Sequence, residues 1–403
     1  MKRFSWAIFL LLSFSFFTRV WGIGIPNTYY FDEVYHAFTA QAYAQNDPQG
    51  YEWWGNSPEG FAYEWLHPPL AKLIQASAIK IFGDQPFSWR FPGILFGVGI
   101  TYLLYLFGRG ILKSERLGFL AALFWSLDGL SLTMSRITMN DIFLTFWVLL
   151  AIYLFLQKRP LFLVGVILGL AISTKWSGVF ILGLLAAFWL KERRAVLGPG
   201  KIKIFALSFI LIPATVYLLS FTQFFLQGHT WGQFLELHRQ TWWYQTNLTA
   251  THAYSSNALE WPFLVRPLFA FTESFDGKVA NIYLQGNPLL WWAGVLSVLW
   301  LVLNIRKESR TVRVVLLTYF VMFLPWAFSP RVMFIYHYLP ALPFLFLILA
   351  WFMDRLWHNN QRWAVLSFLI FSFSLFVVFY PHWTAIPIPK EWDNLYYVIP
   401  SWR

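Results

Sequence analysis

Residues 204–221 read IFALSFILIPATVYLLSF, a stretch without a charged side chain. A helix needs roughly 20 apolar residues to cross the hydrocarbon core of a bilayer, so this stretch is long enough to span a membrane. Similar runs recur along the chain, which is 58% hydrophobic and 12% charged, against about 25% charged residues in soluble domains. Because the runs are continuous rather than alternating, they favour helices over barrel strands. We therefore predict an all-α polytopic membrane protein with about eleven spans, at 4–21, 88–108, 117–133, 140–157, 161–174, 178–190, 204–221, 288–304, 312–329, 336–353 and 363–380.

The basic residues between these spans predict the orientation of the chain. An N-terminus in the cytoplasm places segments 1–3, 109–116, 158–160, 191–203, 305–311 and 354–362 on the inside. Together with Arg313 they hold 18 of the 30 Lys and Arg but only four of the 19 acidic residues. Cytoplasmic loops are enriched in Lys and Arg, so we expect this side to face the cytoplasm. No clear small-residue cleavage site follows the first apolar run, and we expect an uncleaved helix rather than a signal peptide.

The opposite side receives most of the titratable residues. It holds 15 of the 19 acids and seven of the eight His, chiefly in two long outer segments, 22–87 and 222–287. Neither a linker nor an appended soluble module is apparent, so we predict one membrane domain over residues 1–403. Apolar spacing after Asp32, and again after His67-Pro68-Pro69, predicts two amphipathic helices that lie in the membrane interface.

Composition also excludes several kinds of site. The chain has no cysteine, so it forms neither a disulfide nor a cysteine metal site. Its net charge of +11 comes from short basic clusters between apolar runs, which is a topology signal rather than a nucleic-acid-binding patch. The spacing of His229, His238 and His252 matches no zinc pattern. We expect no metal and no nucleic acid as a partner.

Two adjacent carboxylates, Asp32 and Glu33, lie shortly after the first span. Desolvating two such groups beside a membrane is costly, which favours a chemical role at the water boundary. Asp32 is a candidate general base, and the alternative is a helix N-cap. Successive residues of a helix point about 100° apart, so the two carboxylates do not converge on one atom. We expect one of them to act and the other to position a partner.

Four cationic residues lie at outer ends of spans: Arg90, Arg136, Lys175 and Arg331. Each alone can be explained by snorkelling to lipid headgroups. Four at similar depth are better explained as a set that binds phosphate. Asp128 lies inside a predicted span, where an unpaired charge is costly, and we expect Asp128 and Asp141 to pair with some of these cations.

Several motifs, in order over nearly the whole chain, resemble the protein O-mannosyltransferase family, glycosyltransferase family 39 of the GT-C superfamily. They are Phe31-Asp32-Glu33-Val34-Tyr35-His36, His67-Pro68-Pro69-Leu70-Ala71-Lys72, Trp89-Arg90-Phe91-Pro92, Ser135-Arg136-Ile137-Thr138-Met139-Asn140-Asp141, Thr174-Lys175-Trp176-Ser177-Gly178, His252-Ala253-Tyr254-Ser255-Ser256, Gly286-Asn287-Pro288 with Trp291-Trp292, and Tyr336-His337-Tyr338-Leu339-Pro340-Ala341-Leu342. The span count and an outer C-terminus are also similar to that family. The large soluble module of its eukaryotic members is missing, so the chain resembles a short bacterial form.

The resemblance implies a hexosyltransferase that moves mannose from a polyprenyl or dolichyl phosphate to Ser or Thr of a protein. The reaction would take place at the outer face of a bacterial plasma (inner) membrane. The resemblance implies Asp32 as the base, with Glu33 and Arg90 also important. It makes the motif residues His67, Lys72, His337 and Tyr338 candidates for substrate binding. Membrane lipids are further expected partners, and the oligomeric state is left open.

The chemistry of a lipid-phosphate donor is compatible with this transfer reaction, and three alternative functions remain. A lipid phosphate is already a good leaving group, so fixed cations suffice to neutralise it and no cofactor is required. Asp32 would take the proton of the hydroxyl in one inverting displacement. The nearest rival uses the same donor class with a lipid or cell-wall glycan acceptor, as in aminoarabinose transferases. A polytopic transporter or flippase and a structural membrane subunit are the others, although a transporter tends to carry its charges near the midplane.

Overall fold

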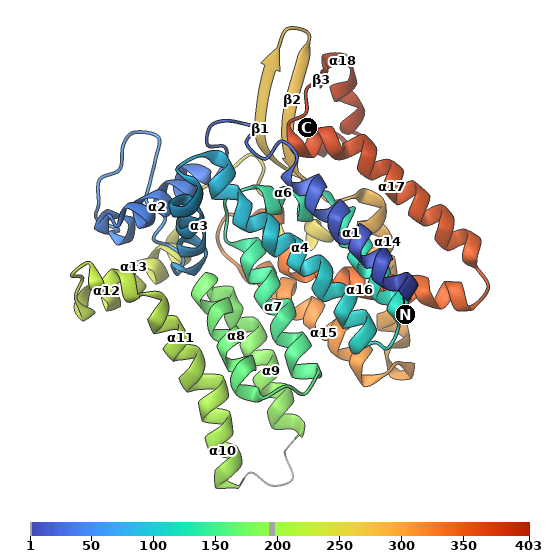
Figure 1. Ribbon diagram of the computed structural model, residues 1–403, viewed down its shortest axis with the longest axis horizontal. Coiled ribbons are helices and arrows are strands. Elements are labelled where there is room, and N and C mark those ends of the chain that lie inside the picture. Colours follow the sequence, from blue (N-terminus) through green and yellow to red (C-terminus); the bar gives the residue numbers. More distant parts are fainter. Residues whose placement is uncertain (1, 193–197) are drawn as a thin grey trace. The chain divides into compact units, whose positions relative to one another are not determined.

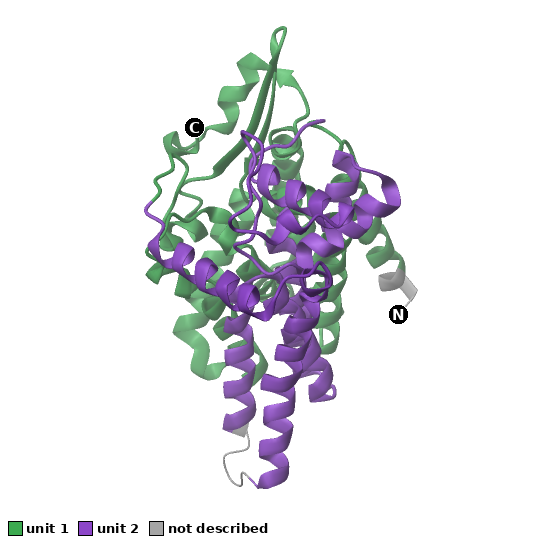
Figure 2. Ribbon diagram, turned by 90° about the vertical axis from the view of Figure 1, so that its left-hand side faces the viewer, with its two compact units in different colours: residues 1–26, 94–136, 250–403 green, residues 27–93, 137–249 purple. Residues whose placement is uncertain are grey.

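The computed structural model describes residues 2–192 and 198–403, so part of the predicted inner segment 191–203 lies outside the described residues. The chain divides into two compact units (Figure 2). Unit 1 comprises residues 1–26, 94–136 and 250–403, and unit 2 comprises 27–93 and 137–249. Each unit is described by itself below. The single domain over 1–403, with its outer segments 22–87 and 222–287, stays a prediction.

The predicted helical membrane fold is confirmed. Within the described ranges, six helices are long and apolar enough to cross a membrane, and a bent pair of helices makes a seventh candidate. Four shorter apolar helices accompany them, at Trp6–Val20, Asp141–Leu156, Leu161–Thr174 and Trp176–Lys191. The number of eleven spans stays a prediction, because several of these helices are shorter than a bilayer is thick.

Unit 2 contains the two helices predicted in the first outer segment, α2 (Glu33–Gln45) and α3 (Leu70–Phe82), which pack on each other (Figure 1). The start of α4 (Pro86–Gly110) follows them. The apolar helices of unit 2 are α7 (Asp141–Leu156), α8 (Leu161–Thr174), α9 (Val179–Glu192), α10 (Pro199–Ala206) and α11 (Ile212–Ser220). The short helix α12 (Thr222–Leu226) and the longer helix α13 (Trp231–Asn247) follow α11.

Two glycines let α8 and α11 approach closely. A Cβ added to Gly165 would lie 2.4 Å from the carbonyl oxygen of Ser208, and one added to Gly169 would lie 2.6 Å from Cβ of Val216. Small residues one turn apart commonly form such close crossings of membrane helices. The backbone between α10 and α11 forms a π-helical turn, Leu207–Leu211, which contains the Ser208 that Gly165 approaches.

We expect Gly165→Ala to lower the stability of the folded protein by about 1–3 kcal/mol, because the new methyl group meets backbone that cannot move aside. The matched control is Gly183→Ala in α9, where an added Cβ has no atom within 4 Å. That change should be neutral or slightly stabilising, since Ala is the better helix former. Thermal unfolding in detergent measures both variants, and equal behaviour would contradict the close crossing.

Unit 1 contains α1 (Lys2–Val20), the rest of α4, α5 (Glu115–Ser126), α6 (Gly129–Arg136), α14 (Pro288–Asn304), α15 (Arg310–Phe323), α16 (Leu342–His358), α17 (Arg362–Thr384) and α18 (Lys390–Asp393). It also holds a three-stranded antiparallel sheet in the order β1 (Leu268–Phe275), β2 (Lys278–Leu284) and β3 (Ile388–Pro389). The strands β1 and β2 form a hairpin with an irregular register between Phe269 and Phe271. This hairpin lies in the predicted outer segment 222–287, for which no strands were predicted.

The predicted span at 117–133 contains a bend of 62° between α5 and α6. Asp128 lies at the bend and accepts hydrogen bonds from the backbone N–H groups of Ser131 and Asn287, each at 2.9 Å. The indole of Trp291 donates to the same carboxylate at 2.6 Å. We expected a cation as the partner of Asp128. Three N–H donors satisfy the buried carboxylate directly instead, and they hold the bend in place.

Candidate active site

Asp32 and Glu33 begin helix α2, yet their side chains have different surroundings. Asp32 occupies the N-cap position but its side chain makes no capping hydrogen bond. The residue before it, Phe31, has φ of 50°. This left-handed conformation costs a residue with a side chain roughly 1–2 kcal/mol. Such strain occurs preferentially at functional sites, and the capping alternative for Asp32 finds no support in its hydrogen bonds.

Glu33 is fully buried and its carboxylate is saturated with donors. Arg90 of α4 contacts both oxygens, with Nε to Oε1 at 2.9 Å and Nη2 to Oε2 at 2.7 Å. The backbone N–H and the hydroxyl of Thr138 donate to Oε1 at 3.0 and 3.1 Å. A two-pronged contact between guanidinium and carboxylate is strong and directional. Glu33 and Arg90 therefore fix the start of α2 against α4 and the segment before α7.

A second buried ion pair lies near Asp32. Lys175 follows the last residue of α8, Asp141 is the first residue of α7, and Lys175 Nζ lies 2.8 Å from Asp141 Oδ1. Both side chains are buried, with exposed fractions of 8% and 3%. The expectation that Asp141 pairs with one of the cations is confirmed.

Glu64 is the centre of a third cluster, which sequence reasoning missed. His67 Nδ1 lies 2.6 Å from Oε1 of Glu64, and Lys72 Nζ contacts Oε2. Burial alone would raise the pKa of Glu64, but the charge of Lys72 and the hydrogen bond from His67 outweigh it and hold that pKa well below its usual range. Burial lowers the pKa of His67, so its ring is neutral at neutral pH. A neutral His67 that donates from Nδ1 keeps Nε2 as an acceptor.

Asp32 differs from these three carboxylates. Among the described residues, its side chain takes part in no hydrogen bond or ion pair, whereas Glu33, Glu64 and Asp141 each have a cation within contact distance. Burial, together with the negative charges of Glu64 and Asp141, raises the pKa of Asp32 to about 7, and Lys175 opposes this rise. A carboxylate with a pKa near neutrality is matched to accepting a proton at physiological pH.

The remaining predicted site residues belong to unit 1. Arg136 donates from Nη1 to the carbonyl oxygens of Arg19 and Trp21, at 2.7 and 2.6 Å. These backbone acceptors orient the guanidinium of Arg136. The ring of His337 is buried and stacks on Tyr336 with centroids 4.5 Å apart.

Tyr338 is buried completely, and its hydroxyl lies 2.6 Å from that of Tyr319. A direct role of Tyr338 in substrate binding stays a prediction, and its complete burial does not favour it.

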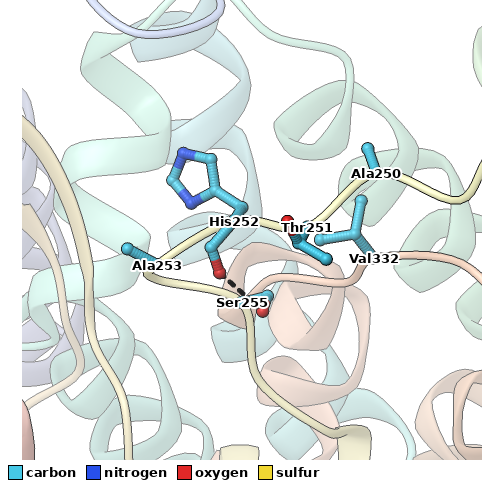
Figure 3. Close-up of a pocket in the computed structure, with 6 residues that line it drawn as sticks. All are labelled: Ala250, Thr251, His252, Ala253, Ser255 and Val332. Atoms are coloured by element: carbon cyan, nitrogen blue, oxygen red, sulfur yellow. Dashed lines mark hydrogen bonds between the residues drawn. The ribbon is translucent and has the colours of Figure 1, made fainter.

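Arg331 lines a polar groove between residues 255–260 and the stretch 326–333. A neighbouring open pocket of about 420 Å³ is lined by Thr251, His252, Ser255 and Val332, with Ala250 and Ala253 (Figure 3). The carbonyl oxygen of His252 accepts a hydrogen bond of 2.8 Å from the Ser255 hydroxyl, which fixes the turn between them. The hydroxyl groups and the imidazole of this pocket, and the guanidinium of the neighbouring groove, suit a polar ligand better than a lipid chain.

The structure places six of the predicted site residues in unit 2: Asp32, Glu33, His67, Lys72, Arg90 and Lys175. The sequence contained one usable signal for the missed Glu64, namely its position three residues before His67, shortly ahead of helix α3. Thr138 gave no comparable signal, since its contact with Glu33 joins residues 105 positions apart. The assignment of roles to all these residues stays a prediction.

Comparisons with known families agree over most of the chain. Residues 9–227 match the family described as dolichyl-phosphate-mannose-protein mannosyltransferase. Residues 230–402 match the C-terminal four-transmembrane region of protein O-mannosyltransferases. A polyprenol-phosphate-mannose–protein mannosyltransferase of Corynebacterium glutamicum is 26% identical, over 84% of this chain and 81% of the relative. The protein of that name from Mycobacterium tuberculosis is 27% identical, over 98% of this chain and 91% of the relative.

Solved structures show the same fold. The yeast Pmt1–Pmt2 protein O-mannosyltransferase complex bound to the sugar donor superposes with a TM-score of 0.81, at 16% identity, covering 100% of this chain and 93% of that chain. ArnT from Cupriavidus metallidurans, bound to undecaprenyl phosphate, superposes with a TM-score of 0.64, at 13% identity, over 93% of this chain and 70% of that chain. At these identities the likeness concerns the fold, which is of the GT-C type.

Proposed function

Because this chain belongs to the dolichyl-phosphate-mannose-protein mannosyltransferase family, we propose that it transfers mannose from a polyprenyl phosphate to Ser or Thr hydroxyls of proteins. It is a multi-pass membrane glycosyltransferase. We further propose that the reaction takes place at the outer face of a bacterial plasma membrane, with the N-terminus in the cytoplasm. The similarity to named actinobacterial relatives over most of their length supports this reading.

The observation that carries the proposed mechanism is the unpaired Asp32 among three paired carboxylates. Asp32 takes the proton of the acceptor hydroxyl while the oxygen attacks C1 of mannose. The bond from C1 to the phosphate oxygen breaks on the opposite face, and the lipid phosphate leaves with both electrons of that bond. One displacement of this kind inverts the configuration at C1. Glycosidases use a carboxylate in the same way to activate an incoming oxygen.

Fixed cations stabilise the charge that grows on the leaving phosphate. Lys175 is the candidate in unit 2, since it is the cation whose charge acts on Asp32. Arg136 and Arg331 stay candidates for the same task. Arg90 forms an ion pair with Glu33, so its first proposed role is to position the start of α2. Binding of the donor phosphate is its second proposed role. This chemistry requires no metal ion, because side chains supply the positive charge.

A transfer assay with purified protein tests the function directly. The protein is incubated with labelled polyprenyl-phosphate-mannose and a panel of acceptors that contains Ser and Thr peptides, Ala-substituted peptides and lipid or glycan acceptors. We expect label on the hydroxyl peptides only. Label on lipid or glycan acceptors alone would favour the rival acceptor class, and donor movement across vesicles without any transfer would favour a flippase.

Asp141→Asn should shift the pH dependence of transfer to lower pH. The change removes a negative charge that raises the pKa of Asp32, and it leaves the positive charge of Lys175 uncompensated beside it. In the unmodified protein we expect kcat/KM to rise with pH through a midpoint near 7, since this parameter reports the free enzyme. The midpoint should fall in Asp141→Asn. The control is Glu59→Gln, which changes an exposed carboxylate and should leave the midpoint where it is. An unshifted midpoint in Asp141→Asn would contradict the assignment of Asp32 as the base.

A further inference from the structure

Helix α13 presents three different faces. Phe234, Leu237 and Thr241 are buried against the rest of unit 2. Gln233, Glu236, Gln240 and Asn247 form a polar face, and the exposed Trp243 lies at the edge of this face that is nearer the stripe described next. The third face is the aromatic stripe, which we define as Trp231, Leu235 and Trp242; these side chains are 54%, 55% and 64% exposed. At about 100° per residue the three point within roughly 40° of one another.

The helix is attached to the ends of two apolar helices. His238, on the inner side of α13, lies 2.7 Å from the hydroxyl of Tyr217 near the end of α11. Trp176, two residues past α8, stacks on the His238 ring with centroids 5.9 Å apart, and its indole donates to Tyr217 at 3.0 Å. In Figure 1, α12 and α13 lie at the end of α11 that is opposite α10. The helix is therefore held at the level where α8 and α11 stop, which is where a membrane surface would be.

The membrane span that precedes the stripe in the chain also exposes apolar side chains. Only 17% of the apolar window in the span Pro199–Ser220 is buried, and its Leu211 and Leu219 are exposed. Leu226 of α12 is 82% exposed and lies between this span and Trp231 in the chain. A surface this apolar needs lipid around it, and the stripe follows this span in the chain after α12.

The residue types fit the interface of a bilayer. Trp side chains concentrate at the level of the headgroups. Arg239 lies beside the stripe and is paired with Glu236 at 2.8 Å, while its side chain remains 75% exposed. A long cationic side chain in that position can reach lipid phosphates while its stem covers apolar surface.

We propose that α13 is a membrane-surface helix whose aromatic stripe inserts into the headgroup and upper acyl region of the leaflet at which α11 ends. The polar face of the helix is turned to water, and the buried face is turned to α11 and the rest of unit 2. This assignment is independent of the reaction proposed above.

The natural absence of cysteine makes a direct test possible, because any introduced cysteine is unique. Single variants Leu235→Cys and Trp242→Cys report on the stripe, and Gln240→Cys reports on the polar face. Leu219→Cys, on the span, serves as the lipid-exposed reference. Each is labelled with a fluorophore and reconstituted into phosphatidylcholine–phosphatidylglycerol vesicles. Quenching is then measured with phosphatidylcholine carrying a nitroxide high on its acyl chain, and separately with iodide in the water.

We expect the ratio of lipid quenching to iodide quenching at positions 235 and 242 to exceed that at position 240 severalfold and to approach that at position 219. Strong iodide quenching at the stripe, equal to that at 240, would overturn the proposal. Protection of the stripe from both quenchers would also overturn it and would indicate a second copy of the chain as the occupant. Two stripe positions are used so that one badly folded variant does not decide the outcome.

Discussion

Asp32→Asn should reduce mannose transfer by about 10²–10⁴-fold while leaving donor binding in place, because the amide keeps the shape of the carboxylate but accepts no proton. Transfer is measured with labelled donor at saturating acceptor peptide. Donor binding is measured on the same preparation as the rise in melting temperature on addition of polyprenyl-phosphate-mannose. Asp32→Glu is the matched variant, since it keeps basicity and moves it by one methylene group. We expect Asp32→Glu to retain more activity than Asp32→Asn.

Asp32→Asn should also stabilise the folded protein, but only at a pH at which Asp32 would be ionised. The pKa of Asp32 is raised from its ordinary value of 3.8 to about 7 by burial and by the charges of Glu64 and Asp141. Between these two values the unfolded chain is ionised at this residue and the folded protein is not, so stability falls as the pH rises through that window. Above pH 7 the buried, ionised Asp32 lowers the stability of the folded protein by its full amount. Asp32→Asn removes this destabilisation.

We therefore expect the melting temperature of Asp32→Asn to exceed that of the unmodified protein at pH 8, with the difference disappearing as the pH falls towards 4. A variant that loses activity and stability together at pH 8 would indicate a structural Asp32. Full turnover by Asp32→Asn would remove Asp32 from the role of base altogether.

Arg90→Leu should destabilise the protein by about 3–5 kcal/mol, because it leaves the carboxylate of Glu33 buried without its cation. Both partners are almost inaccessible, with exposed fractions of 1% for Arg90 and 0% for Glu33. Glu33→Gln should also be destabilising, since it leaves a buried guanidinium unpaired. Thermal unfolding in detergent, followed by size-exclusion chromatography of the soluble fraction, measures both losses.

The double variant Glu33→Gln with Arg90→Met provides the control for that pair. It removes both charges, so its loss of stability should be clearly smaller than the sum of the two single losses. Additive losses would contradict the buried pair. The double variant also separates the two roles of Arg90: a raised KM for the donor with the fold intact would indicate contact with the phosphate, and an unchanged KM would leave positioning as its role.

The membrane helices could be predicted from sequence because the bilayer imposes a local rule. The predicted spans 161–174 and 288–304 coincide with α8 and α14, since lipid requires an unbroken apolar helix and the run of residues shows it directly. The bend after α5 could not be predicted in this way. It depends on partners of Asp128 that lie 159 and 163 residues further along the chain.

The outer segments were harder to predict for a related reason. The hairpin β1–β2 and helix α13 lie outside the apolar spans, where no continuous run of residues marks an element. Within the candidate site, the separation of about 100° between Asp32 and Glu33 predicted different surroundings for the two carboxylates, and the structure has them so. Glu64 was missed because its importance arises from burial beside Lys72 and His67, which composition does not reveal.

The configuration at C1 of the product tests the proposed mechanism most directly. The mannosylated peptide made by the purified protein is isolated, and the one-bond carbon–hydrogen coupling at C1 is compared by NMR with that of the lipid-linked donor. A single displacement assisted by Asp32 predicts that the product has the opposite anomeric configuration to the donor. Retention of configuration would contradict it, since retention requires two successive displacements through a sugar bound covalently to the protein.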